Sequence, residues 1–274
     1  MIELTVLCEN SVYSHLGAIA EHGWSVYVQT PEGDFLFDTG LGLALRNNLA
    51  YFNKDLSKIS GIIISHHHTD HTGGLKDALL LSGGTKVYSH PDLFKESYSI
   101  GREQRYIGIP YSKAYLEGLG AEWVFNREFT EIAPSIYLTG EVPRKTSYEL
   151  GDERQVIDTK EGFKPDPLLD DQSLVFKTEK GLVILLGCGH AGIINILNHA
   201  IEKTGEERIH AILGGTHLGP VSQEQREKSI EALQSFSIDN LGVSHCTGAE
   251  TVEKLGKIYQ EKFFQSSVGT RFTV

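Results

Sequence analysis

A histidine-rich segment places the strongest constraint on what this chain can fold into. Residues 66–74 are His-His-His-Thr-Asp-His-Thr-Gly-Gly, and they follow an apolar run over residues 61–65. Such a run predicts a buried strand, and open α/β sheets place their ligand sites at the carboxyl ends of strands. The alternative is a surface tract or a remnant of a tag, but a tag would lie at a terminus. The position therefore favours a built site.

The spacing within this segment predicts a site for two metal ions. His66 and His68 are two residues apart in an extended stretch and can grip one ion, while Asp70 and His71 can hold a second. A mixed nitrogen and oxygen donor set suits zinc, manganese or ferrous iron. Two such ions about 3.5 to 4 Å apart can hold a hydroxide that acts as the nucleophile. Asp70 is thus expected to act as a ligand and as a catalytic group that orients water.

Composition limits the class of protein and of partner. The chain has 274 residues and a formal net charge of −11, which predicts a single domain over 1–274 and argues against nucleic acid as a partner. No apolar stretch approaches the roughly 18 residues of a membrane span, and no basic region precedes the first apolar residues. Three cysteines, an odd number, fit a reducing compartment. These features predict a cytoplasmic protein with a small-molecule substrate and leave homo-oligomerisation open.

The chain carries two similar strand patterns, one in each half. Strands are expected at 2–7, 24–30 and 35–38, and a second hairpin at 172–177 and 182–186. The pattern then changes to a helix from about 193, a strand at 209–214, a helix that Ser222 and Gln225 begin as a capping box, and a strand at 241–244. The residues between about 91 and 170 are less regular, and such segments commonly determine the choice of substrate.

Three further histidines each follow an expected strand in a turn that contains glycine or cysteine. They are His190, His217 and His245. Strands that end alike in one direction converge on one edge of a sheet, so we expect these side chains to join the first cluster. The other histidines lack a second feature that points to a metal, although two of them could line the cleft: His22 and His90.

These motifs together resemble the metallo-β-lactamase superfamily. The resemblance rests on Ser65-His66-x-His68-x-Asp70-His71-x-Gly73-Gly74 and on Phe37-Asp38-Thr39-Gly40. Further segments resemble the branch that includes the 7,8-dihydropterin-6-ylmethyl-4-(β-D-ribofuranosyl)aminobenzene-5′-phosphate synthase of methanopterin biosynthesis. They are Glu21-His22-Gly23, residues 139–144, Asp170-Asp171-Gln172, residues 187–192, residues 214–218 and residues 245–248. The resemblance covers essentially the whole chain and implies an α/β (α+β) fold, the four-layer αββα sandwich, with a two-metal site at one edge.

The resemblance also implies roles for individual residues. His66 and His68 resemble ligands of the first metal, which His190 would complete, while Asp70 and His71 resemble ligands of the second, and His245 the last histidine of the superfamily pattern. Many members place a bridging aspartate after the strand expected here at 182–186, whereas this chain has Cys188 and His190. Cys188 is therefore a candidate ligand or neighbour of the ligands, and Asp38 is expected to orient a ligand histidine.

Three residues are candidates for handling the substrate. Arg144 follows Gly140 and Pro143 in a stiffened turn, and its guanidinium matches phosphate oxygens, unless it is a surface arginine paired with Glu141 or Glu149. His22 is a candidate for binding substrate in the cleft. An imidazole with an ordinary pKa near 6.5 suits proton donation to a leaving group, and we assign that catalytic role to His217.

The sequence thus predicts a metal-dependent hydrolase or transferase, with two zinc ions as the expected cofactors and manganese or iron as alternatives. The resemblance points to a phosphorylated or pterin-type small molecule, with condensation of a dihydropterin and an arylamine as one reaction. The alternatives are a metal-dependent phosphodiesterase or ester hydrolase, and a binding module of low turnover on the same fold. An iron-bearing oxygen reductase would normally have a glutamate where this chain has His67.

Overall fold

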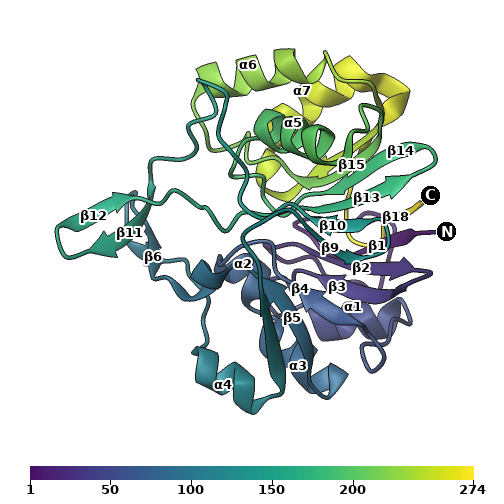
Figure 1. Cartoon of the computed structure of the whole chain (residues 1–274), viewed down its shortest axis with the longest axis vertical. Coiled ribbons are helices and arrows are strands. Elements are labelled where there is room, and N and C mark those ends of the chain that lie inside the picture. Colours follow the sequence, from purple (N-terminus) through teal and green to yellow (C-terminus); the bar gives the residue numbers. More distant parts are fainter. The chain divides into compact units, whose positions relative to one another are not determined.

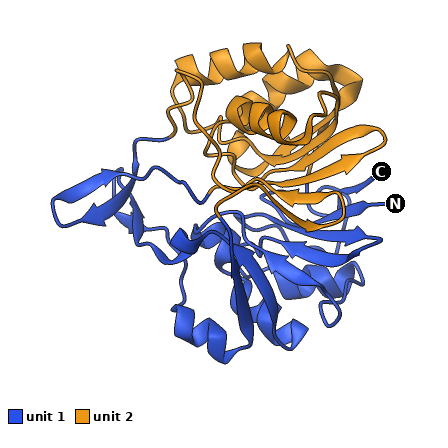
Figure 2. Ribbon diagram, viewed as in Figure 1, with its two compact units in different colours: residues 1–126, 152–170, 267–273 blue, residues 127–151, 171–266, 274 orange.

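The computed structural model describes residues 1–274 (Figure 1). The chain divides into two compact units, coloured blue and orange in Figure 2. Unit 1 comprises Met1–Asn126, Asp152–Asp170 and Ser267–Thr273, and unit 2 comprises Arg127–Gly151, Asp171–Ser266 and Val274. The expectation of a single domain stays a prediction. The segment between 91 and 170 contributes to both units.

Unit 1 is built on a seven-stranded sheet with the order β18-β1-β2-β3-β4-β5-β8. The pairs from β18 to β3 are antiparallel and those from β3 to β8 are parallel. The strands are β1 Glu3–Cys8, β2 Ser25–Thr30, β3 Gly33–Phe37, β4 Gly61–Ile63, β5 Thr85–Ser89, β8 Ala121–Phe125 and β18 Arg271–Thr273. The predicted hairpin is confirmed, because β2 pairs with β3 and the Thr30 hydroxyl closes the turn on the carbonyl of Gly33 at 2.7 Å.

Helices cover one face of this sheet and bury its apolar side chains. The helices are α1 Leu45–Tyr51, α2 Thr69–Thr72, α3 Leu75–Ser82 and α4 Lys113–Gly118, with the short 3-10 helix η1 Pro91–Phe94. Leu45 of α1 and Leu79 of α3 share a fully buried cluster with Leu36, Ile62 and Val87 of the sheet. Figure 1 shows α1 and α3 beside β3, β4 and β5. Burial of this face fixes the end of β4, from which the histidine-rich segment leaves.

A small four-stranded sheet with the order β12-β11-β6-β7 completes unit 1. Its strands are β6 Ser97–Ser99, β7 Arg105–Tyr106, β11 Gln155–Thr159 and β12 Gly162–Pro165. All of its pairs are antiparallel, and Ile157 of β11 pairs with Ser97 of β6. Part of the segment expected to be less regular is therefore ordered by pairing between strands that are far apart in the sequence.

Unit 2 contains a second seven-stranded sheet with the order β17-β16-β15-β14-β13-β10-β9. Its strands are β9 Thr130–Ala133, β10 Ile136–Leu138, β13 Leu174–Thr178, β14 Gly181–Leu185, β15 Ile209–Gly215, β16 Ile238–Ser244 and β17 Phe263–Gln265. The predicted β13–β14 hairpin is confirmed, and the pairs from β14 to β17 are parallel. Parallel pairing places the carboxyl ends of β14, β15 and β16 at one edge of this sheet.

Three helices lie on one face of the second sheet (Figure 1). They are α5 Ile193–Thr204, α6 Gln223–Leu233 and α7 Ala249–Tyr259, and the 3-10 helices are η2 His245–Thr247 and η3 Gln260–Lys262. Ile196 of α5, Ile230 of α6 and Leu255 of α7 pack in one cluster with Ile212 of β15. Ser222 accepts a hydrogen bond from the amide of Gln225, which confirms the predicted start of α6. None of the helices combines the length and hydropathy that crossing a bilayer requires.

Candidate metal centre

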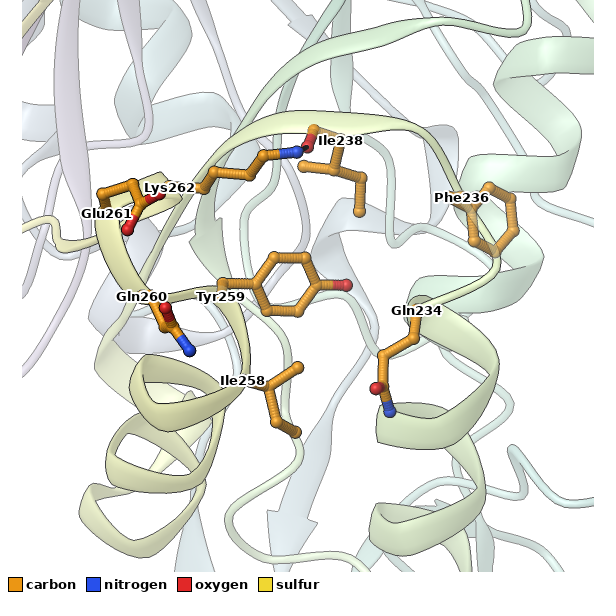
Figure 3. A pocket seen from close by; sticks show the side chains of 8 residues that line it. All are labelled: Gln234, Phe236, Ile238, Ile258, Tyr259, Gln260, Glu261 and Lys262. Carbon is orange, nitrogen blue, oxygen red and sulfur yellow. Dashed lines mark hydrogen bonds between the residues drawn. The ribbon is translucent and has the colours of Figure 1, made fainter.

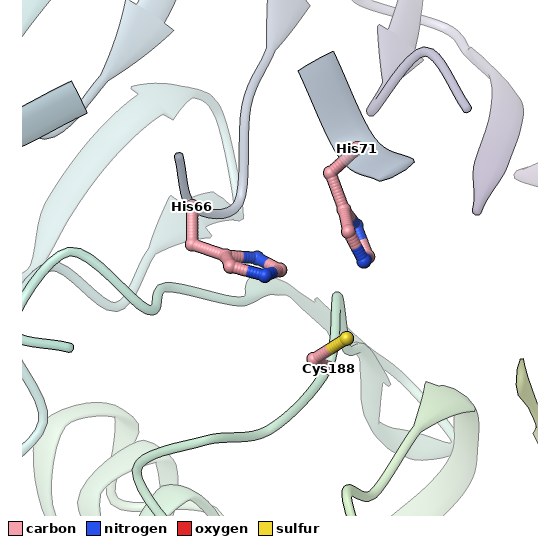
Figure 4. Close-up of side chains that lie close together, drawn as sticks. All are labelled: His66, His71 and Cys188. Atoms are coloured by element: carbon pink, nitrogen blue, oxygen red, sulfur yellow. The ribbon is translucent and has the colours of Figure 1, made fainter. Parts of the chain in front are cut away.

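The histidine-rich segment of unit 1 runs from the end of β4 into the short helix α2. His68 is the residue before α2, with an extended backbone, so His66 and His68 precede the helix and His71 lies within it. The His66 Nε2 and His68 Nδ1 atoms are 3.0 Å apart, and the His66 and His71 ring centroids are 4.2 Å apart. Figure 4 shows the two rings, and it also labels Cys188, which is described with unit 2 below. The segment brings three imidazoles together.

Burial sets the protonation state of this cluster. His66 and His71 are almost inaccessible, and His68 is 5% exposed. Desolvation, with the positive charge of neighbouring histidines, lowers the pKa of His66 and of His68 well below 6.5. Both rings are therefore neutral at neutral pH, which is the form of histidine that ligates metals.

Asp38 supports this cluster from the end of β3. Its Oδ1 accepts the Ser65 amide at 2.7 Å, and its Oδ2 lies 2.7 Å from both the Ser65 hydroxyl and the His71 Nδ1. The Ser65 hydroxyl is also 2.9 Å from the His66 Nδ1. A carboxylate that accepts a hydrogen bond from Nδ1 fixes the tautomer of His71 and leaves Nε2 as the nitrogen that can bind a metal. This geometry supports the orienting role expected of Asp38, which stays a prediction.

Asp70 and His22 lie beside the imidazole cluster at the protein surface. Asp70 Oδ2 is 3.3 Å from His22 Nε2 and 3.8 Å from His71 Nε2. The His22 side chain is 64% exposed, whereas that of Asp70 is 20% exposed. The position of His22 is accessible to a small molecule, and it is the Asp70 carboxylate that joins it to the cluster.

His67 belongs to a separate buried charge network that the sequence does not reveal. Its Nδ1 is 2.7 Å from Asp170 Oδ2, and its amide donates to the same oxygen at 2.8 Å. Its Nε2 lies 2.6 Å from the Ser97 hydroxyl. Lys95 Nζ donates to Asp170 at 2.7 Å and to Asp166 at 2.8 Å. The network therefore anchors the backbone between two candidate ligands, His66 and His68.

The charges in this network reinforce one another. Burial alone would raise the pKa of Asp170, but the charge and hydrogen bond of His67, with the charge of Lys95, hold it well below its ordinary 3.8. Burial alone would lower the pKa of Lys95, but Asp170 and Asp166 raise it. Asp170 is thus a buried carboxylate at neutral pH.

In unit 2, three neighbouring parallel strands end in turns that carry histidine or cysteine. Cys188 and His190 follow β14, His217 follows β15, and His245 and Cys246 follow β16. The ligand atoms of Cys188, His190 and His217 lie within 4.8 Å of one another, and so do those of Cys188, His245 and Cys246. The His190 and His217 ring centroids are 4.1 Å apart. The expected convergence of these three turns is therefore found within unit 2.

Backbone strain marks the same turns. His217 has a φ of 50° and His245 a φ of 55°, a left-handed conformation that is uncommon for residues other than glycine. Asp38 in unit 1 has a φ of 55°. Strained residues of this kind cluster at functional sites, where the surrounding structure holds them in place.

Cys246 was not among the residues singled out from the sequence. Its Sγ accepts the His217 amide at 3.3 Å and contacts the Cys188 carbonyl at 3.5 Å. Burial alone would raise the pKa of the Cys246 thiol, but hydrogen bonds from Cys188 and His217 and the charges of His245 and His217 lower it well below 9.0. The one available signal was the adjacency of this cysteine to a strand-end histidine.

Arg144 lies on the surface of unit 2 and contacts the turn after β14. Its Nη1 donates to the His190 carbonyl at 2.8 Å. Glu141 accepts from Arg127 at 2.6 Å, while the buried Glu149 accepts from the amides of Ile194 and Asn195 at 2.9 and 3.0 Å. Glu149 therefore caps the N-terminus of α5 and positions the helix that follows His190. The role of Arg144 toward a substrate phosphate stays a prediction.

A pocket of about 400 Å³ lies elsewhere in unit 2, between the ends of α6 and α7 (Figure 3). Its lining includes Phe236, Ile258 and Tyr259, and the Tyr259 hydroxyl donates to the Leu233 carbonyl at 3.0 Å. None of the predicted site residues lines this pocket.

Comparison with known proteins identifies the family. The sequence model of one protein family, the metallo-beta-lactamase superfamily, matches residues 19–200. The chain belongs to the metallo-β-lactamase superfamily. A crystal structure described as Tm1679, a metal-dependent hydrolase of the beta-lactamase superfamily, aligns with a TM-score of 0.85 and 29% identity over 100% of this chain and 99% of that chain. The predicted metallo-β-lactamase fold is therefore confirmed, as a mixed α/β structure with three sheets.

Two curated relatives come from Methanocaldococcus jannaschii. The 7,8-dihydropterin-6-methyl-4-(beta-D-ribofuranosyl)-aminobenzene-5′-phosphate synthase is 29% identical over 91% of this chain and 89% of its own length. The uncharacterized protein MJ0448 is 33% identical over 93% of this chain and 94% of its own length. The predicted resemblance to the branch of that synthase is confirmed.

The donor atoms fit the divalent metal that this superfamily fold implies. Unit 1 supplies neutral imidazoles with a carboxylate, and unit 2 supplies imidazoles with two thiols. Such sets suit zinc and other borderline ions, whereas magnesium and calcium prefer oxygen donors. The assignment of individual ligands to two ions, with His190 completing the set of His66 and His68, stays a prediction.

Proposed function

We propose that this chain is a divalent-metal-dependent enzyme that acts on a phosphorylated or pterin-type small molecule. The observation that carries the proposal is the preorganised cluster of unit 1. There, His66, His68 and His71 are buried together, and the Asp38 Oδ2 lies 2.7 Å from the His71 Nδ1. Burying neutral imidazoles beside an accessible carboxylate costs stability, and such an arrangement is typical of a catalytic metal site.

In this proposal His66, His68 and His190 hold the first ion, and Asp70, His71 and His245 hold the second. Zinc is the expected ion, with manganese or iron as alternatives. The ions, when bound, stabilise a developing oxygen anion and lower the pKa of water. The protein contributes positioning, because Asp38 and Ser65 fix the rings and the network around His67 and Asp170 fixes the backbone between the ligands.

The remaining residues are proposed to handle the substrate and its protons. Asp70 orients the nucleophile from the edge of the imidazole cluster, where its carboxylate is accessible. His217 donates a proton to the leaving group, and His22 contacts the substrate from the surface. Arg144 binds a substrate phosphate through its guanidinium. Cys188 remains a candidate ligand in place of the bridging carboxylate that many superfamily members have.

Condensation of a dihydropterin with an arylamine is the transferase form of this proposal. The arylamine nitrogen attacks the methylene carbon of an activated hydroxymethyl-dihydropterin, the bond from that carbon to the leaving oxygen breaks, and the nitrogen loses a proton. Similarity to the 7,8-dihydropterin-6-methyl-4-(beta-D-ribofuranosyl)-aminobenzene-5′-phosphate synthase supports this reaction. The second candidate is hydrolysis of a phosphate ester or diester by water, and similarity to a metal-dependent hydrolase supports its hydrolytic chemistry.

Two parallel assays on one metal-loaded preparation test the proposal. The protein is purified without added metal, analysed for its elements, and loaded with zinc, manganese or iron. One assay joins an activated hydroxymethyl-dihydropterin to 4-(β-D-ribofuranosyl)aminobenzene 5′-phosphate and detects the product by mass spectrometry. The other measures release of alcohol or phosphate from a panel of phosphomonoesters and phosphodiesters.

The outcomes separate the candidates. Joined product that disappears with a chelator supports the transferase, and ester cleavage alone supports the hydrolase. Asp70→Asn keeps the shape and removes the charge, so turnover should fall at least about tenfold in the active assay. A protein that binds metal but shows no turnover in either assay would overturn the enzymatic proposal in favour of a binding module.

A further inference from the structure

Two cysteines and a histidine meet at one edge of the second sheet. Cys188 lies in the turn after β14, and His245 and Cys246 begin η2 directly after β16. The Cys188 Sγ, the Cys246 Sγ and a ring nitrogen of His245 lie within 4.8 Å of one another. All three residues belong to unit 2. This donor set is therefore formed by a single compact part of the chain.

Strand β15 lies between β14 and β16, and the glycine at its end leaves room for Cys188 and Cys246. β15 separates β14 from β16 in the sheet and ends at Gly215. A Cβ atom at Gly215 would lie 2.5 Å from the Cys246 Sγ and 3.2 Å from the Cys188 Cα. Any side chain at this position would displace the thiol, so the glycine is required for the two cysteines to approach.

Hydrogen bonding and backbone geometry fix the thiols in place. The His217 amide donates to the Cys246 Sγ at 3.3 Å. Amide hydrogen bonds to sulfur are a recurrent support of metal-bound thiolates and tune the metal. His245 holds a φ of 55°, so the backbone that carries both His245 and Cys246 is kept in one strained conformation. Cys188 is 3% exposed and His245 is 8% exposed.

The chemistry of these donors selects a class of ion. Soft thiolates favour zinc and other thiophilic ions over magnesium, calcium or manganese. Two thiolates balance the charge of a divalent ion. Catalytic zinc sites with a Cys₂His set keep a fourth position open for water or substrate. A Cys₂His set at the carboxyl ends of parallel strands can therefore form a catalytic metal site as well as a structural one.

We propose that Cys188, His245 and Cys246 bind one zinc-type divalent ion as a Cys₂His set. Cys246 is then a metal ligand, and Cys188 acts as a ligand through its thiolate. The proposal deepens the proposed function, on which it rests through His245, the residue already assigned to the second ion. It names the donors that unit 2 supplies to that ion, two sulfur atoms beside the nitrogen of His245, and leaves the proposed roles of Asp70 and His71 unchanged. A set of nitrogen and oxygen donors alone would contradict it.

Cobalt substitution tests the sulfur ligands directly. Cobalt(II) bound by thiolates gives an intense near-ultraviolet charge-transfer absorption that imidazole and carboxylate ligands do not give. The metal-free protein, kept under a non-thiol reductant, is titrated with cobalt chloride and then with zinc chloride. The variants are Cys246→Ser, Cys188→Ser and, as a matched control, Cys8→Ala. Cys8 is a buried core residue of β1 in unit 1.

We expect wild type and Cys8→Ala to show the absorption and to lose it on adding zinc. Cys246→Ser should lose about half of the intensity and at least about tenfold in zinc affinity, since even supporting residues of metal sites contribute that much. Circular dichroism of the metal-free variants checks that they fold. Full absorption in Cys246→Ser would overturn the proposal.

Thiol protection supplies a second readout that needs no variant. Wild-type protein is treated with iodoacetamide with and without zinc, and the modified cysteines are located by mass spectrometry. We expect zinc to slow alkylation of Cys188 and Cys246 together. Equal rates with and without zinc would overturn the sulfur ligands. The protein could bind metal at full stoichiometry but show neither the thiolate charge-transfer absorption nor protection of the cysteines. That result would overturn this inference and leave the proposed function standing. Failure to bind any divalent metal would overturn both.

Discussion

The His67 Nδ1 atom donates to the Asp170 carboxylate at 2.7 Å, across 103 residues of sequence, and both side chains are fully buried. The same carboxylate accepts the His67 amide at 2.8 Å, so it binds backbone and side chain together. His67 lies between His66 and His68, which face the candidate metal centre. The Asp170 contact therefore fixes the backbone between two candidate ligands.

Removing the Asp170 charge should destabilise the fold strongly. Asp170→Asn keeps the size of the side chain but removes its negative charge. Lys95 is then left with a single carboxylate partner, and a neutral amide replaces the carboxylate that accepts from His67. Breaking a buried ion pair by removing one partner typically costs about 3 to 5 kcal/mol. We expect a loss of this order in the free energy of unfolding, measured by urea denaturation at pH 7.

An exposed ion pair provides the control for this variant. Glu253 and Lys257 form an i, i+4 pair on the surface of α7, with side chains about 70% exposed. Glu253→Gln should leave the free energy of unfolding unchanged, because exposed pairs are screened by solvent. If Asp170→Asn were as mild as this control, the buried network would be unimportant for stability.

The buried Asp170 carboxylate also predicts a dependence of stability on pH. The pKa of Asp170 is held well below 3.8 in the folded protein, whereas the unfolded chain has the ordinary value. Below 3.8 the unfolded state therefore binds the proton first, and the stabilisation is lost as the pH falls toward the folded pKa. Above 3.8 it is fully present. Wild type and Asp170→Asn should thus differ most near neutral pH and converge in acid, as urea midpoints over a pH series can show. A constant difference would contradict the assignment.

Local patterns in the sequence predict the strands and turns near the site well. The hairpins β2–β3 and β13–β14 and the helix α5 follow from runs of apolar residues and turn signals in adjacent positions. The strand-end histidines of unit 2 also follow from a local pattern, because each is preceded by its own strand. Such features need no information from distant residues.

Partners that are distant in the sequence escape this kind of analysis. Ser222 caps α6 as predicted, but the Gln225 side chain binds the amides of Leu150 and Gly151, 75 and 74 residues away, in place of completing the capping box. Glu149 caps α5 from outside the helix. The pairing of β6 with β11 orders part of a segment without a regular pattern. In each case tertiary packing supplies the partner, and the residue type alone does not name it.

The first metal site makes a direct prediction for His68. Its Nδ1 lies 3.0 Å from the Nε2 of His66, and burial lowers the pKa of the ring well below 6.5, so the neutral ring is available to a metal. His68→Ala should abolish occupancy of that site, measured by elemental analysis after dialysis against zinc. His210→Ala is the control, because His210 of β15 pairs with Asp239 of β16 at 3.0 Å near the amino ends of these strands, away from the carboxyl ends that carry the candidate ligands. Full occupancy in His68→Ala would remove it from the ligand set.

Arg144 predicts a difference between phosphorylated and dephosphorylated substrates. Its guanidinium already donates to the His190 carbonyl, so its structural role should affect both substrates equally. A hydrogen bond to a charged group is worth about 1.5 to 3 kcal/mol, so Arg144→Ala should lower kcat/KM on the phosphorylated substrate by roughly tenfold to a hundredfold more than on the dephosphorylated one. Arg144→Lys should recover part of this loss. Arg127→Ala, which removes an exposed partner of Glu141, is the control. Equal losses on both substrates would restrict Arg144 to a structural role.

His217 and His245 should separate into a proton donor and a ligand. Both follow parallel strands and both hold a left-handed backbone, so position and strain do not distinguish them. His245 shares a group of possible ligand atoms with Cys188 and Cys246, whereas His217 shares one with Cys188 and His190. His245→Ala should therefore lower the metal stoichiometry, while His217→Ala should keep the metal and lose turnover at least about a hundredfold, the low end of what general acid catalysis contributes. Elemental analysis and steady-state kinetics on the same preparations give both quantities. If the stoichiometry falls with His217→Ala and not with His245→Ala, the two roles are exchanged, and the Cys₂His set loses its histidine.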